Sequence, residues 1–117
     1  MRITEIVYET GQPVDGYGPG FFRLGDAVHH GPLAVLPGGV LSWAGWPDCG
    51  VFTERAGDID VLLAGMGAEI APVPEAAARA LEAAGIGVEP MSSPSACRTY
   101  NILLAEGRRV GLAALPI

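Results

Sequence analysis

Apolar runs alternate with amphipathic stretches through the second half of the chain. Residues 59–64 form an apolar run that predicts a strand, and Gly65-Met66-Gly67 then starts a loop that leads to a helix at residues 74–84. Gly85 is expected to end this helix. The buried stripe of the helix should consist of Ala77, Ala80, Leu81 and Ala84. The later apolar segments that predict strands are residues 86–91 and 110–115.

A second helix is predicted between Ser93 and Gly107. Ser93 can cap the free backbone N–H groups, and Pro94 needs no hydrogen-bond partner at the first helical position. Gly107 can take the left-handed conformation that closes a helix. The side that should pack on a sheet carries Ala96, Tyr100, Leu103 and Leu104. A neighbouring stripe carries Arg98, Asn101 and Ala105.

The first third of the chain is rich in β-forming residues and turn signals. The glycine-rich residues 15–20 predict a loop, and Gly25-Asp26 is a hairpin signal that should pair its flanking strands antiparallel. The predicted strands are residues 3–9, Phe21–Leu24, Ala27–His30 and Leu33–Leu36. Residues 40–51 are too irregular for a long helix. Trp43 is expected to cap the core, whereas Trp46 is open to a core role or to exposure as an anchor for a partner protein.

Strands alternating with helices of this length predict an α/β fold with right-handed crossovers, with α+β character in the N-terminal third. The 117 residues fit a single domain, residues 1–117. Three layers are expected, in which helices flank a central sheet and the β-rich first third adds a further β layer.

Charge and hydropathy exclude several classes of partner. The net charge is −6 and all seven basic residues are arginine, which argues against nucleic acid, although a local basic patch of Arg98, Arg108 and Arg109 stays open. No apolar run approaches the roughly 20 residues needed to span a bilayer, so an integral membrane protein is not expected. The N-terminus lacks a basic segment followed by an apolar one, and a cytoplasmic location is therefore predicted.

The histidines and cysteines do not predict a metal site. His29 and His30 are neighbours on a predicted strand and should point to opposite faces, one exposed and the other packed. Cys49 and Cys97 lie far apart without metal-ligand spacing, and free thiols are expected in a reducing compartment, with a disulfide as the alternative.

Polar side chains near the start of the second helix form a candidate site for a small anion. Ser95, Arg98, Thr99 and Asn101 lie within the first turns, where the helix N-terminus favours negative charge. Ligands of α/β sheets usually bind at strand ends, which adds Gly65 and Gly67. A dinucleotide is not expected because the third glycine of the usual motif is missing and no acidic residue ends the next strand, so no cofactor is predicted.

A structural interpretation of the same residues stays open. Arg98 can pair with a carboxylate or cover apolar surface, and Asn101 can bond nearby backbone. Cys97 is then a small buried hydrophobe. If it is instead a nucleophile, Arg98 and the helix N-terminus would lower the pKa of its thiol, whereas burial would raise it.

Five motifs occur in the order found in the MTH nine-three-eight-like family, which this chain resembles over nearly its whole length. They are residues 15–21, Val35-Leu36-Pro37 with Trp43 downstream, residues 62–67, residues 85–89, and residues 96–101 through 106–110. The resemblance implies a three-layered fold with a central mixed sheet, helices and an additional β layer. It supplies no established catalytic residues.

Two functions follow from the resemblance and the residues. Because mitochondrial members of the family include an assembly factor for respiratory complex I, the first is a noncatalytic assembly or scaffold factor with protein partners; no Ser-His-Asp or Cys-His set stands at a credible spacing. The second is a small anionic-ligand-binding protein or an enzyme. Its candidate residues are Gly65, Gly67, Cys97, Arg98, Thr99 and Asn101. The sequence leaves both a monomer and a homodimer open, and exposed edge strands in a small mixed sheet would permit a dimer.

Overall fold

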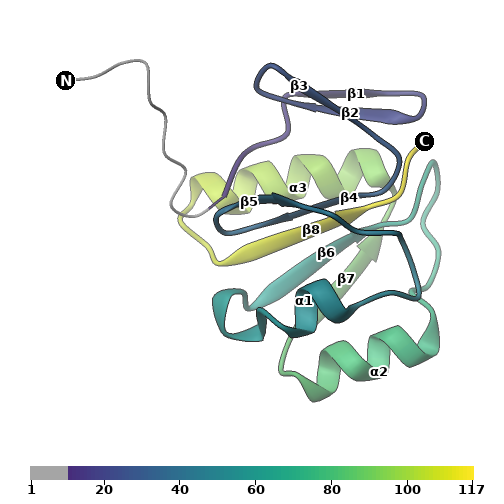
Figure 1. The fold of residues 1–117 in the computed structure, drawn as a ribbon, viewed down its shortest axis with the longest axis vertical. Helices are drawn as coiled ribbons and strands as arrows, with labels where there is room; N and C mark the ends of the chain where they lie inside the picture. Colours follow the sequence, from purple (N-terminus) through teal and green to yellow (C-terminus); the bar gives the residue numbers. More distant parts are fainter. Residues whose placement is uncertain (1–10) are drawn as a thin grey trace.

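A five-stranded mixed sheet with the strand order β5-β4-β8-β6-β7 forms the centre of the computed structural model, which describes residues 11–117 (Figure 1). The strand expected at residues 3–9 lies outside the described residues. β6 pairs in parallel with β7 and β8, whereas β4 runs antiparallel to β5 and β8. The five strands are β4 (Leu33–Leu36), β5 (Gly39–Leu41), β6 (Val61–Gly65), β7 (Gly87–Met91) and β8 (Val110–Ala114).

Helices cover both faces of this sheet, which explains why its central strands read as continuous apolar runs. α3 (Ser93–Ala105) lies on one face, and α1 (Gly50–Thr53) and α2 (Glu75–Ala83) lie on the other (Figure 1). Successive residues of β4 face opposite cores: Val35 packs with Tyr100 on the α3 side, and Leu36 packs with Phe52 on the other side. None of the helices in residues 11–117 has the length and apolar character needed to cross a bilayer.

A small antiparallel sheet forms the additional β layer on the α3 side, where its Phe22 and Leu24 pack into the α3 core. The predicted hairpin is confirmed, since Leu24 stands opposite Ala27 and Gly25 has a positive φ of 61°. The loop expected at residues 15–20 is wrong in part, because Gly16–Gly18 pairs with the neighbouring strand. The three strands are β1 (Gly16–Gly18), β2 (Phe21–Leu24) and β3 (Ala27–His30). The three-layered α/β fold is thus confirmed.

Two further details differ from the expected pattern. Ala77 and Leu81 of α2 are buried as expected, but Ala80 is exposed and Ala84 is half-buried, because α2 touches the sheet along a narrow stripe. The strand β5 was not predicted, since its three residues, Gly39–Leu41, become a strand only through pairing with β4.

Trp43 is buried as expected, and Trp46 is half-buried in an aromatic cluster with Trp43 and Phe52.

Candidate functional site

The end of β6 lies against the start of α3, as the sequence predicted. A Cβ atom added at Gly65 would come within 2.8 Å of both Cα and Oγ of Ser93 and within 3.2 Å of the Cβ of Ala96. Real side chains do not approach so closely, so glycine is what lets the helix sit on the end of the strand.

Ser93 joins the two elements and the C-terminal segment. Its hydroxyl accepts a hydrogen bond from the backbone N–H of Gly67 at 2.9 Å and donates one to the carbonyl of Leu115 at 2.6 Å. Its backbone N–H also donates to the carbonyl of Gly67 at 2.7 Å. Ser93 was expected to cap the helix, but this prediction is wrong, because its hydroxyl is engaged with Gly67 and Leu115. The N-cap is Ser92, whose Oγ accepts from the backbone N–H of Ser95 at 3.4 Å.

The other half of the candidate site lies on a different side of α3. Cys97, Arg98 and Asn101 line a hollow of about 190 Å³ whose remaining walls are Val14, Asp15, Gly16, Tyr17 and Pro94. Gly65, Gly67 and the half-buried Thr99 are not among its lining residues. The structure therefore brings together three of the six predicted residues and separates the two glycines from them, because the helix itself fills the space at the end of β6.

Asn101 uses both ends of its amide to hold the segment that precedes β1. Its Oδ1 accepts from the backbone N–H of Val14 at 2.9 Å, and its Nδ2 donates to the carbonyl of Val14 at 2.8 Å. On the preceding residue of the same helix, the Tyr100 hydroxyl donates to the carbonyl of Gln12 at 2.9 Å. These bonds match the structural interpretation of Asn101 and leave its amide little capacity for a ligand.

Cys97 lies at the base of the hollow but is only 3% exposed. Burial raises the pKa of its thiol to about 12, so the thiol is protonated at neutral pH. Cys49 packs in the core on the opposite face of the central sheet, and both thiols are free. Burial therefore argues against Cys97 as a nucleophile. A Cys49–Cys97 disulfide is incompatible with this fold, because the central sheet separates the two thiols.

The reactivity of Cys97 can be measured directly. In a Cys49→Ser variant, we expect iodoacetamide at pH 8 to alkylate native Cys97 at least about a hundredfold more slowly than the same thiol in urea, because only the thiolate reacts and burial suppresses it. The rate should rise with pH up to about 12 if the fold persists. A native rate equal to the unfolded rate would contradict the burial argument and restore Cys97 as a candidate nucleophile.

Arg98 is the exposed cation of the hollow. Among the ion pairs of residues 11–117, none involves Arg98, whereas Arg109 pairs with Asp60 at 2.7 Å. The hydrogen bond from Arg109 holds the pKa of Asp60 below its usual value. Arg108 and Arg109 follow the far end of α3, about 15 Å from Arg98 along a helix of this length. The three arginines therefore do not form one basic patch.

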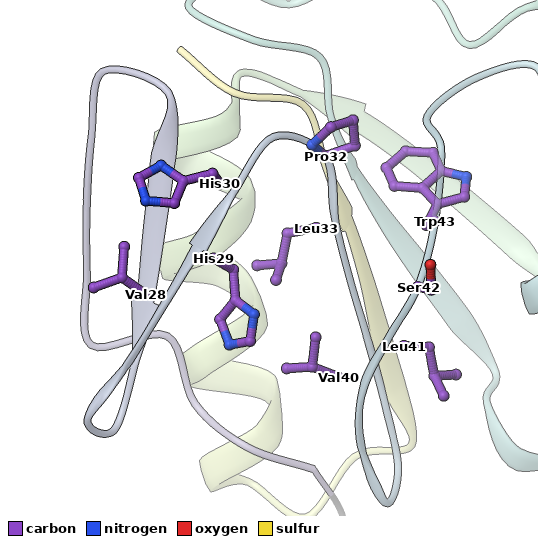
Figure 2. A pocket seen from close by; sticks show the side chains of 9 residues that line it. All are labelled: Val28, His29, His30, Pro32, Leu33, Val40, Leu41, Ser42 and Trp43. Carbon is purple, nitrogen blue, oxygen red and sulfur yellow. The ribbon is translucent and has the colours of Figure 1, made fainter.

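A second, larger hollow was not predicted from the sequence. It measures about 420 Å³ and lies between β3 and β5 (Figure 2). Its lining residues are Val28, His29, His30, Pro32, Leu33, Val40, Leu41, Ser42 and Trp43. His29 is half-buried and His30 is exposed, as their alternation predicted. Residues 11–117 contain no group of three or more His, Cys, Asp or Glu side chains arranged to hold a metal ion.

Comparison with known proteins gives a family and named relatives. Residues 14–115 match the family described as Protein of unknown function (DUF498/DUF598). An uncharacterized protein of Rhodobacter capsulatus is 51% identical over 105 residues, which cover 90% of this chain and 85% of that protein. The Drosophila melanogaster protein named NADH dehydrogenase (ubiquinone) 1 alpha subcomplex assembly factor 3 is 36% identical over 98% of this chain. This chain covers 65% of the length of the fly protein.

Solved structures show the same fold. A crystal structure described as an outer membrane protein from Bartonella henselae has a TM-score of 0.82 and 32% identity over 93% of this chain and 98% of that chain. A solution structure from Bordetella pertussis, described as a Mth938-like domain, has a TM-score of 0.72 and 31% identity over 99% of this chain and 92% of that chain. The resemblance found in the sequence motifs is thereby confirmed.

Proposed function

Because the chain belongs to the family of proteins of unknown function DUF498/DUF598, we propose that it is a noncatalytic factor that binds protein partners during the assembly of respiratory complex I. The observation that carries the proposal is the similarity to the fly assembly factor over 98% of this chain. The free thiols of Cys49 and Cys97 suit the reducing cytoplasm, where we place the protein.

The contacts of the candidate site support a noncatalytic role. The amide of Asn101 and the hydroxyl of Ser93 are both used in hydrogen bonds that hold the fold together. The buried thiol of Cys97 is held in its unreactive, protonated form. Asn101, a candidate ligand-binding residue, therefore has a structural role, and Cys97, the candidate nucleophile, is buried, as expected of a protein that acts through its surface.

The test is made in a bacterium that produces both this protein and complex I. Deleting the gene should lower the amount of assembled complex I on native gels and the NADH:quinone activity of membranes, and the tagged chain should capture complex I subunits. Cys97→Ser, which removes the thiol and keeps its size, should restore assembly fully. Normal complex I in the deletion strain, with no subunit captured, would refute the proposal, and failure of Cys97→Ser at normal protein levels would refute its noncatalytic part.

A second function, the binding of a small anion, is favoured by the exposed guanidinium of Arg98 in the 190 Å³ hollow. Small carboxylates and inorganic phosphate should then raise the melting temperature of the protein, and Arg98→Ala should abolish the rise. Arg79→Ala is the matched control, because Arg79 is an exposed arginine on a different helix. If no carboxylate or phosphate raised the melting temperature in a way that depends on Arg98, the proposal of anion binding would be refuted.

A further inference from the structure

The 420 Å³ hollow is a groove between two strand edges that have no second neighbour among residues 11–117. β3 is the last strand of the small sheet and pairs there with β2, while β5 is the last strand of the central sheet and pairs with β4. Both strands contribute lining residues, and Figure 2 shows Leu33 between them. Unpaired strand edges are the usual template for binding an extended chain.

The register fixes which backbone groups face the groove. A two-residue turn joins Leu36 to Gly39, so these two residues form a hydrogen-bonded pair and the next residue, Val40, points its N–H and C=O away from β4. The same alternation applies to β3, where the N–H of Gly31 donates to the carbonyl of Gly20 at 3.1 Å. Val28 and His30 therefore turn their backbone groups away from β2. β3 therefore offers two residues, and β5 one, whose backbone donors and acceptors can pair with an added strand.

The side chains of the groove select the character of the occupant. The half-buried Val40 gives it apolar surface, whereas Leu33 and Trp43 line it but are only 1% and 6% exposed. None of its lining residues is acidic, although the whole chain has thirteen acidic residues and a net charge of −6. His29 points into the space between the two strands (Figure 2), where an imidazole N–H can donate to a carboxylate. The groove is thus a place where an acidic segment meets hydrogen-bond donors without facing acidic neighbours.

We propose that this groove binds an extended, acidic segment of a partner protein, which adds as a strand along the free edge of β5. Alternate side chains of the segment are apolar and face Val40, and a carboxylate faces His29. The identity of the partner rests on the proposed function in complex I assembly. The binding itself does not, so the two ideas can fail separately.

The probe is a displayed library of random twelve-residue peptides, selected on the full chain of 117 residues. Enriched peptides should alternate apolar residues and contain Asp or Glu. On binding, the NMR amide signals of Val28 and Val40 should shift. Val40→Pro removes one donor at a free edge, where proline is tolerated, and should weaken binding about tenfold or more. Val40→Ala keeps this donor and controls for the lost side chain.

A change on the peptide side avoids any doubt about folding of the variant. Methylating the peptide nitrogens that face β5 should abolish binding, whereas methylating the alternate nitrogens should not. Exchanging the acidic residue of the peptide for lysine should weaken binding at least about tenfold if it meets His29. The proposal is overturned if no peptide is enriched, if binding survives both Val40→Pro and methylation, or if a dimer of this chain formed through β5 excludes the peptides. Normal complex I in the deletion strain, with peptide binding intact, would refute the assembly function alone.

Discussion

Gly65→Val is expected to lower the free energy of unfolding by about 3 kcal/mol, because the added side chain has no space between β6 and α3. Even its first atom, Cβ, would lie 2.8 Å from the Cα of Ser93, which is backbone and cannot rotate away. The helix would have to lift from the strand end, which would also break the bonds that Ser93 makes to Gly67 and Leu115. Gly65→Ala should lie between wild type and valine.

Urea unfolding followed by tryptophan fluorescence measures this effect, since Trp43 is buried in the core of the other face. The matched control is Gly57→Val, because a Cβ at Gly57 meets nothing within 4 Å and its φ is not positive. This control should change stability by about 0.5 kcal/mol or less. Wild-type stability of Gly65→Val would contradict the seating of α3 on the end of β6.

The parts of the fold that the sequence predicted are those set by local chemistry and by burial on both faces. The apolar runs of β4, β6 and β8 are buried by helices on each side of the sheet, so they could be recognised without knowing their partners. Gly25 has a positive φ in a two-residue hairpin, and this too is a local signal. Such features survive in a single sequence because each is decided within a few residues.

The missed parts depend on partners distant in the chain. β1 and β5 have three residues each and contain glycine, so only pairing with their neighbours makes them strands. The groove between β3 and β5 could not be predicted either, because β5 itself is a strand only through pairing with β4. For the candidate site, the sequence placed Gly65 near the start of α3, but it could not show that Ser93 fills the gap and that Arg98 points to another side.

Asn101→Leu is expected to lower the free energy of unfolding by about 2 to 4 kcal/mol, because leucine has a similar size but offers no hydrogen bond to Val14. The backbone N–H and C=O of Val14, which is buried, would then lose their hydrogen-bond partner. Asn101→Asp should cost less, since an oxygen can still accept from the N–H of Val14, yet its other oxygen would face the carbonyl and repel it.

The measurements for Asn101 are urea unfolding and hydrogen exchange at the Val14 amide, which should lose protection in Asn101→Leu more than in Asn101→Asp. Ile102→Ala is the control, because Ile102 is the next residue of α3 and is 53% exposed, so its loss should change stability by about 0.5 kcal/mol or less. If Asn101→Leu kept wild-type stability and Val14 protection but failed to support complex I assembly, Asn101 would belong to a binding site. If stability and Val14 protection fall together, the segment before β1 is held by α3, and the hollow beside Arg98 exists because Asn101 fixes one of its walls.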